Sequence, residues 1–249
     1  MIRDLWLIGI GTGSPSHLTL EGRQALCDAA VILLPRKGAG KEGLADIRSR
    51  ILSETGATAR VVPFDMPVRD DALPYQERVA RWHDEIACIW QKALAGETLN
   101  GPVALMVWGD PGLYDSTLRI AERLSPRPTL RVVPGITALQ ALTAAHGIPF
   151  NTIDGTVCVT TGQKLRTRGY PEGAETTVVM LDGKCSFMSL GEPDLHIWWG
   201  AFLGMPEQIL ASGLLREVGP RIVEMRETAR AEHGWIMDTY LMRRGRQDA

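Results

Sequence analysis

The sequence lacks the residue patterns that mark several common classes of protein. Its 249 residues include four cysteines, and no two of them form a Cys-x-x-Cys pair, which excludes the usual zinc and redox motifs. The five histidines show no His-x-x-x-His spacing, so no metal site is expected. We expect the cysteines to be core thiols of a protein in a reducing compartment; they are Cys27, Cys88, Cys158 and Cys185.

A strong net charge and long apolar runs are also lacking. The formal net charge is −2, whereas nucleic-acid-binding domains are usually basic, so no nucleic-acid partner is expected. No apolar run approaches the roughly 18 residues that span a bilayer. Arg3 and Asp4 stand where a signal peptide would be apolar. We therefore expect a cytoplasmic protein with no membrane partner.

Short apolar runs and longer amphipathic stretches alternate in the first part of the chain. This alternation is typical of a parallel sheet with helices on both faces. The apolar runs predict strands at 5–10, 31–34, 59–62, 102–107 and 130–133. The amphipathic stretches predict helices at 19–30, 43–54, 75–94, 116–124 and 136–146, with Thr19 as an N-cap.

The stretch GIPFNTIDG, at 147–155, interrupts this alternation with glycine, proline and asparagine. We expect a domain boundary there, between an N-terminal α/β domain at 1–148 and a C-terminal α/β domain at 149–249. The second domain has a less regular pattern and is expected to hold a mixed sheet. Its predicted strands lie at 156–161, 176–181, 195–199, 221–225 and 234–240.

Three predicted strands end in loops rich in glycine and proline: GIGTGSP at 9–15, GDPGLYDST at 109–117 and VPGITAL at 133–139. Because the carboxyl ends of parallel strands meet at one edge of a sheet, we expect these loops to lie together. Glycine lets the backbone approach a ligand closely, so the loops favour a small polar ligand held largely by main chain. Alternatively, Asp110 is only a turn and cap residue and Thr137 only an N-cap.

The first loop does not match the dinucleotide fingerprint. The spacing G-x-G-x-x-G would need glycine at Ser14, and no acidic residue follows the strand at 31–34. The same absence argues against the common Rossmann-type methyltransferase. The sequence also lacks the G-x-S-x-G elbow of hydrolases and the phosphate-binding loop of nucleotide hydrolases.

Other side chains leave two interpretations open. Basic residues gather in two loops, and they either form solvated surface or surround a polycarboxylate ligand; they are Arg36, Lys37 and Lys41, and Lys164, Arg166 and Arg168. Trp198 and Trp199 either pack in the core or line an apolar face of a site. His83, beside Trp82 on a predicted helix, is interpreted as structural.

Together, the stretches LIGIGTGSPSHLTLEG, GDPGLYDST and VPGITALQALTAAHGIPF resemble the tetrapyrrole methylase family. Weaker matches continue through VTTGQK, TTVVMLDG and IWWGAFLGMPEQI, so the resemblance covers nearly the whole chain. Members use S-adenosylmethionine to methylate porphyrinoid macrocycles, mostly in cobalamin and sirohaem synthesis. The resemblance implies two α/β domains, the first with a parallel and the second with a mixed sheet. It also implies S-adenosylmethionine in the cleft between them, no metal, and a homodimer.

The resemblance also implies which positions bind the cofactor. Loops of the first domain would hold its amino-acid end, and strand ends of the second domain would reach its adenosine. The implied residues are Gly109, Asp110, Leu113, Thr137, Ala138, Asp182, Ala201 and Gly204. In this arrangement the carboxylate of Asp110 faces an ammonium group or a hydroxyl.

Two positions depart from the family pattern. Thr12 stands where many members have proline, so the first loop is expected to differ in shape. Pro35 stands where uroporphyrinogen-specific members carry aspartate, which argues against that substrate.

Within the family, three stretches look most like the members that methylate C-1 of precorrin-5 and release the C-20 acetyl fragment as acetate. These stretches are 31–38, the tryptophan-bearing helix predicted at 75–94, and 197–210. The implied substrate is a polycarboxylate tetrapyrrole. No catalytic residue is assigned, although Asp110, Tyr114 and Asp115 lie in a suitable loop. The alternatives are methylation at another ring position or on a protein side chain, and a nucleotide-binding regulator without chemistry.

Overall fold

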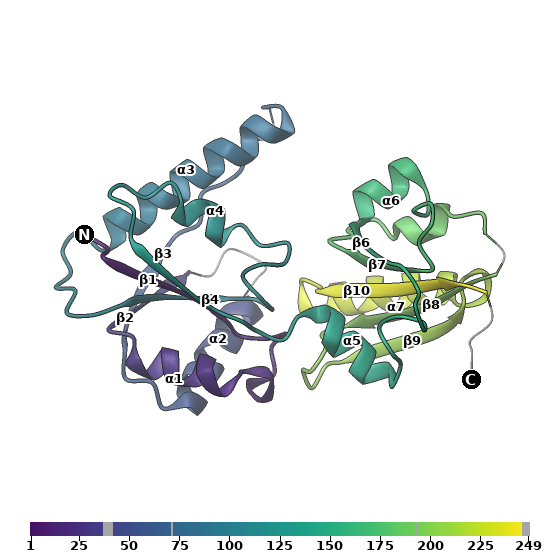
Figure 1. Cartoon of the computed structure of the whole chain (residues 1–249), viewed down its shortest axis with the longest axis horizontal. Coiled ribbons are helices and arrows are strands. Elements are labelled where there is room, and N and C mark those ends of the chain that lie inside the picture. Colours follow the sequence, from purple (N-terminus) through teal and green to yellow (C-terminus); the bar gives the residue numbers. More distant parts are fainter. Residues whose placement is uncertain (37–41, 71, 193, 246–249) are drawn as a thin grey trace. The chain divides into compact units, whose positions relative to one another are not determined.

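The computed structural model describes residues 1–36, 42–70, 72–192 and 194–245. Its contacts divide the chain into two compact units, Met1–Thr137 and Ala138–Ala249 (Figure 1). The sequence-based boundary, after residue 148, lies later in the chain. Helix α5 (Ala138–His146) falls in the second unit because it packs on that unit's sheet, where His146 Nε2 is 3.0 Å from the carbonyl oxygen of Trp199.

The first unit is built on a parallel sheet of five strands in the order β3-β2-β4-β1-β5. All four strand pairs within it are parallel, as the alternating pattern predicts. The strands are β1 (Asp4–Gly9), β2 (Val31–Pro35), β3 (Arg60–Phe64), β4 (Val103–Val107) and β5 (Thr129–Val133).

Helices cover both faces of this sheet because neighbouring apolar residues of its strands point to opposite sides. Leu5 and Leu7 pack with Trp90 of α3, whereas Ile8 and Ile10 pack with Leu26 of α1. The predicted N-cap Thr19 is confirmed, since its Oγ1 accepts a hydrogen bond from the Gly22 N–H (2.9 Å). The helices are α1 (Leu20–Asp28), α2 (Glu42–Thr55), α3 (Tyr75–Ala93) and α4 (Thr117–Ala121), with the 3₁₀ turn η1 (Pro15–His17) before α1.

The second unit holds a mixed sheet in the order β6-β7-β10-β8-β9, as predicted. Its strands are β6 (Val157–Thr161), β7 (Thr176–Met180), β8 (Leu195–Ala201), β9 (Ile209–Leu214) and β10 (Asp238–Arg244). Strands β6 and β7 are parallel, and β10 is antiparallel to both β7 and β8. Strands β7 and β8 therefore run in the same direction, and their carboxyl ends lie at one edge of the sheet. Helix α6 (Gly162–Arg168) follows β6.

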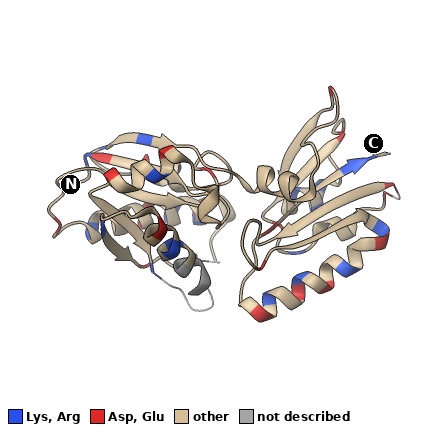
Figure 2. Cartoon of the chain, turned by 90° about the horizontal axis from the view of Figure 1, so that it is seen from below, with Lys and Arg blue, Asp and Glu red and all other residues tan. Residues whose placement is uncertain are grey.

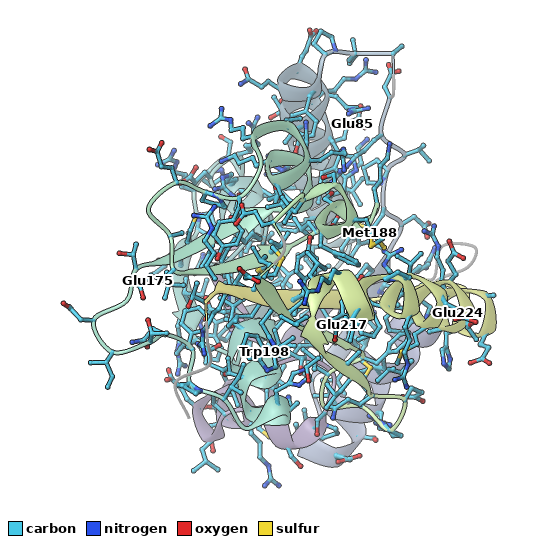
Figure 3. The ribbon with its side chains drawn as sticks, turned by 90° about the vertical axis from the view of Figure 1, so that its right-hand side faces the viewer. Glu85, Glu175, Met188, Trp198, Glu217 and Glu224 are labelled. Atoms are coloured by element: carbon cyan, nitrogen blue, oxygen red, sulfur yellow. The ribbon has the colours of Figure 1, made fainter. Side chains whose placement is uncertain are left out.

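The strand predicted at 221–225 is wrong, because this stretch lies inside α7 (Leu215–His233). The buried positions of α7 recur every three or four residues, as in a helix; they are Leu215, Gly219, Ile222, Arg226 and Ala229. The short run of β-branched residues was outweighed by this longer periodicity. Met188 of the 3₁₀ turn η2 (Ser186–Ser189) packs over Gly219 of α7 (Figure 3).

The expectation that the cysteines are core thiols is also wrong. Cys27 and Cys88 are exposed, and Cys158 and Cys185 are half-buried; all four are free. Cys88 lies off the buried face of α3, which is formed by His83, Ile86, Ala87 and Trp90. The core interpretation of Trp198 and Trp199 is confirmed, since both are buried in β8.

Charged residues occur on the helices and loops of each unit (Figure 2). Along α7, arginines and glutamates are interspersed, as at Arg216, Glu217, Arg221 and Glu224. Over the described ranges of the chain, none of the helices combines the length and the apolar character that a membrane crossing requires.

Candidate functional site

The three glycine-rich loops of the first unit lie together at the carboxyl edge of its sheet, as predicted. After β1 and β4 the chain forms a further bridge, in which Gly109 N–H donates to the Gly11 carbonyl (2.8 Å) and Gly11 N–H donates to the Gly109 carbonyl (3.3 Å). Gly109 and Gly11 both have positive φ, at 62° and 74°, where glycine is favoured.

The end of β5 packs against the same two loops so closely that only glycine fits. A Cβ on Gly135 would lie 2.0 Å from the Gly109 carbonyl oxygen and 2.8 Å from the Gly9 carbonyl carbon. A Cβ on Gly9 would lie 2.6 Å from the Gly135 nitrogen. Backbone therefore touches backbone where β1, β4 and β5 end, and we call these three loops, 9–13, 109–115 and 133–137, the glycine rim.

Asp110 holds two loops of the glycine rim together. Its Oδ1 accepts a hydrogen bond from Gly112 N–H (2.7 Å), which forms the turn, and its Oδ2 accepts one from Gly135 N–H (3.0 Å). A carboxylate offers about four acceptor positions. Two of them are used here, so the predicted turn role is present and acceptor capacity for a ligand remains.

The other predicted residues of this region lie close to Asp110 or begin the second unit. Leu113 N–H donates to the Asp110 carbonyl (3.2 Å). The Cα of Thr137 lies 3.7 Å from where a Cβ on Gly109 would stand. Ala138 is the first residue of α5. The structure thus brings Gly109, Asp110, Leu113 and Thr137 together.

In the second unit, Asp182 follows β7 and is buried. Its Oδ2 accepts hydrogen bonds from Ser186 N–H and the Tyr240 hydroxyl, both at 2.6 Å. Its Oδ1 accepts hydrogen bonds from the Ser186 hydroxyl (2.8 Å) and Lys184 N–H (3.1 Å). All four acceptor positions are used. The side chain predicted to bind a cofactor therefore has a structural role, and any ligand contact from this turn must come from its neighbours.

A buried ion pair lies beside Asp182. Arg226 Nε donates to Asp238 Oδ2 (2.9 Å), which also accepts from Trp199 Nε1 (3.0 Å). Arg226 further donates to the Asp182 carbonyl (3.3 Å). Burial, together with the charge of Asp182, raises the pKa of Tyr240, so its hydroxyl remains a donor. These contacts fix the turn after β7 to the start of β10.

Leu181 immediately precedes Asp182 and combines two unusual features. Its φ is +55°, which is rare for leucine, and 67% of its surface is exposed. Strained backbone of this kind often marks a functional site. Ala201 is buried at the end of β8, and Gly204 follows with φ +78° and its N–H donating to Gln208 Oε1 (2.8 Å). Because β7 and β8 end at one edge, the predicted residues of this unit share that edge.

The structure adds a residue that the sequence did not reveal, Arg48 of α2. Its guanidinium carbon lies 4.8 Å from the centroid of the Trp108 ring, directly after β4. Its Nε is buried and has no hydrogen-bond partner within the described part of the chain. Burial lowers the pKa of Arg48 to about 10, although the charge of Asp115 opposes this. A half-buried cation whose Nε–H has no partner among the described residues is suited to a ligand carboxylate.

The residues of the two predicted basic clusters differ in their contacts. Arg36 is exposed and pairs with Asp65 (3.1 Å), while Lys37 and Lys41 lie outside the described residues. Lys164 and Arg168 are exposed on α6. Arg166 donates to the Ser186 hydroxyl (2.9 Å), which links α6 to the turn that holds Asp182.

Comparison with known proteins gives one consistent family. The model of the Tetrapyrrole (Corrin/Porphyrin) Methylases matches residues 4–219. A precorrin-6A synthase [deacetylating] from Sinorhizobium sp is 44% identical over 98% of this chain and 96% of its own. The crystal structure of a cobalamin synthesis related protein (CobF) from Corynebacterium diphtheriae is 38% identical, with a TM-score of 0.83 over 98% of this chain and 99% of its own.

A more distant structure shares the fold. The uroporphyrin-III C-methyl transferase from Thermus thermophilus, solved in complex with S-adenosylhomocysteine, is 20% identical. Its TM-score is 0.58 over 96% of this chain and 91% of its own.

Proposed function

Because this chain belongs to the tetrapyrrole (corrin/porphyrin) methylases, we propose that it is a precorrin-6A synthase (deacetylating). It uses S-adenosylmethionine to methylate C-1 of precorrin-5 and releases acetate to give precorrin-6A in cobalamin biosynthesis. The observation that carries this proposal is the 44% identity to the Sinorhizobium enzyme, which extends over 98% of the chain.

The glycine rim suits the amino-acid end of S-adenosylmethionine. Asp110 has acceptor positions left for an ammonium group, and the bare backbone at Gly109 leaves room beside Thr137. We propose that Leu113 and Ala138 complete this half of the site. In the second unit we propose that the turn at Leu181–Asp182 and the segment from Ala201 to Gly204 reach the adenosine, with Asp182 acting through its fixed backbone.

When bound, S-adenosylmethionine supplies a methyl group that is already activated by the sulfonium. A reduced macrocycle provides an electron-rich carbon, so methyl transfer needs little acid–base assistance. The chain contributes mainly by orientation: a methyl group held in line, about 3–3.5 Å from the carbon, accounts for much of the acceleration. Backbone loops held as rigidly as the glycine rim suit this role.

We propose that Arg48 binds a carboxylate of the tetrapyrrole. Its half-buried charge, and an Nε–H that has no hydrogen-bond partner among the described residues, can provide a charge-assisted hydrogen bond to this carboxylate. The variant Arg48→Met is expected to raise KM for the macrocycle at least tenfold and to leave the Kd for S-adenosylmethionine unchanged. Arg23→Met, at an exposed position of α1, is the matched control. Equal effects of the two variants would contradict this role.

The proposal includes a homodimer that works in the cytoplasm on a polycarboxylate substrate, as the family resemblance implies. Light scattering at micromolar concentration is expected to give twice the mass of the chain. A monomeric mass would contradict the dimer and leave the proposed reaction intact.

The reaction is tested by incubating the protein with S-adenosylmethionine and precorrin-5. The expected result is one acetate and one S-adenosylhomocysteine for each precorrin-6A formed. Methylation without release of acetate would be consistent with membership of the family but would refute the assignment to the deacetylating subgroup. Turnover of a different precorrin would assign another ring position, and binding of S-adenosylmethionine without turnover of any macrocycle would favour a nucleotide-binding regulator.

A further inference from the structure

Just after the first loop of the glycine rim lies a histidine that methyl transfer does not use. His17, in η1, lies directly against Gly11: a Cβ on Gly11 would stand 2.5 Å from His17 Cβ and 2.9 Å from the His17 carbonyl oxygen. Gly11 in turn forms the backbone bridge with Gly109. The imidazole is therefore attached to the rim at the point where β1 and β4 end.

The orientation of the ring is set by a neighbour in the same loop. His17 Nδ1 lies 2.7 Å from Thr12 Oγ1, and Thr12 is buried. Within the described part of the chain, no hydrogen bond is found for His17 Nε2. In the tautomer in which Nδ1–H donates to Thr12, Nε2 carries a lone pair that can accept a proton. Burial also lowers the pKa of His17, which keeps the ring neutral near pH 7.

The acidic groups of the rim are already engaged with backbone. Asp110 accepts hydrogen bonds from Gly112 and Gly135. Asp115 Oδ1 accepts one from Thr117 N–H (2.6 Å) at the start of α4. Both carboxylates therefore have structural contacts that hold turns, whereas His17 Nε2 has no such contact with a described residue.

Building on the proposed function, we propose that His17 is the general base of the acetate-releasing half of the reaction and that Thr12 positions its ring. Methylation at C-1 adds a methyl group without its bonding electrons, which leaves the macrocycle short of one electron pair. Release of the acetyl group without its bonding electrons restores that pair.

The acetyl carbon must then be taken by water. His17 Nε2 removes a proton as the water oxygen forms a bond to the acetyl carbonyl carbon. The bond between that carbon and the macrocycle breaks, and its electron pair remains on the macrocycle. The products are acetic acid, which ionises to acetate, and a protonated His17, which returns its proton to solvent. No oxidant or reductant is needed.

Single-turnover assays with enzyme in excess over precorrin-5 separate methyl transfer from acetate release. S-adenosylhomocysteine reports methyl transfer, and acetate reports deacetylation. His17→Gln is expected to form S-adenosylhomocysteine within about threefold of the wild-type rate. Its acetate release is expected to fall about 100-fold or more, the usual contribution of a general base. A methylated macrocycle that still carries the acetyl group is expected to accumulate.

Two further variants complete the test. Thr12→Val keeps the shape of the side chain and is expected to slow acetate release about tenfold with methyl transfer unchanged. Ser16→Ala, at an exposed position of the same turn, is the control and is expected to match wild type, because Ser16 bonds Ser14 through its backbone N–H.

The outcomes distinguish the claims. If His17→Gln slows both products equally while its melting temperature is unchanged, His17 is not the base. If that variant melts at a lower temperature, Thr12→Val decides, and an equal loss of both products would refute the inference. Unchanged acetate release in His17→Gln would also refute it. A wild-type protein that methylates without releasing acetate would overturn the proposed deacetylation and this inference with it, whereas the His17 results alone leave the proposed function standing.

Discussion

Asp110 and Asp182 occupy similar places in the two units but differ in what their carboxylates do. Each lies within three residues of the end of a strand, β4 for Asp110 and β7 for Asp182. Asp110 accepts two hydrogen bonds, both from backbone N–H groups. Asp182 accepts four, two from backbone and two from the hydroxyls of Ser186 and Tyr240. The number of acceptor positions left decides which of them can also bind a ligand.

The two units therefore build their strand ends in different ways. In the first unit, glycines remove side chains so that backbone packs on backbone, and one aspartate joins the loops. In the second unit, a buried network of side chains holds the turn, and the large apolar side chain of the neighbouring Leu181 is exposed. Loss of a glycine should act through steric overlap, and loss of a carboxylate through unpaired donors. The following variants test this difference.

The largest effect is expected for Gly135→Ala. Its Cβ would overlap the Gly109 carbonyl oxygen at 2.0 Å, and both partners are backbone, so neither can rotate away. We expect a loss of at least about 3 kcal/mol in the free energy of unfolding. Urea denaturation measures this. Gly96→Ala is the control, because no atom of the described residues lies within 4 Å of where its Cβ would stand, and it should change stability by less than about 0.5 kcal/mol. Similar values for both would refute the close packing of the rim.

Asp182→Asn is expected to have the next largest effect. An amide replaces one acceptor oxygen with an N–H₂ group that faces donors, so buried donors lose their partner. The expected loss of stability is about 3 kcal/mol. Tyr240→Phe removes only one donor and should cost about 1 kcal/mol. If Asp182→Asn weakened S-adenosylmethionine binding without destabilising the fold, the structural role of this carboxylate would be wrong.

Asp110→Asn should weaken ligand binding more than it lowers stability, the reverse of what is expected for Asp182→Asn. One oxygen remains for Gly112, so the cost in stability is expected to be about 1 kcal/mol. The loss of charge beside an ammonium group should weaken S-adenosylmethionine about 10- to 100-fold, as for a lost hydrogen bond to a charged group. Calorimetry gives the Kd. An unchanged Kd would reduce Asp110 to a turn residue, the alternative that the sequence left open.

The contrast also explains which features were predictable. The glycine rim was predictable because positive φ and close backbone approach both require glycine, and glycine is visible in a sequence. The network around Asp182 was not, since its partner Tyr240 lies 58 residues away and no local pattern links the two. Arg48 was not predictable for a similar reason: an arginine in a helix is usually solvated, and only the structure shows its packing on Trp108 and its buried Nε.

The helical segment 221–225 shows the same limit on the scale of an element. A window of five residues favoured a strand, whereas the buried positions of α7 show their spacing only over three or more turns. Similarly, the unit boundary depends on where α5 packs, which is decided by residues of β8 and β10 far along the chain.

The smallest effect on stability is expected at Leu181. With 67% of its surface exposed, Leu181→Ala should change the free energy of unfolding by less than about 0.5 kcal/mol. Leu181→Gly should be at least as stable as Leu181→Ala, because glycine accepts φ +55° without strain. If this side chain is held outward to contact the adenosine, both variants should weaken S-adenosylmethionine about tenfold, the effect of losing part of a buried leucine. Ile153→Ala, which is fully exposed in the same unit, serves as the control for affinity. If all three variants bind S-adenosylmethionine equally well, the strained backbone after β7 results from burying Asp182 and does not serve to present Leu181. The second unit would then have to contact the cofactor through the segment after β8.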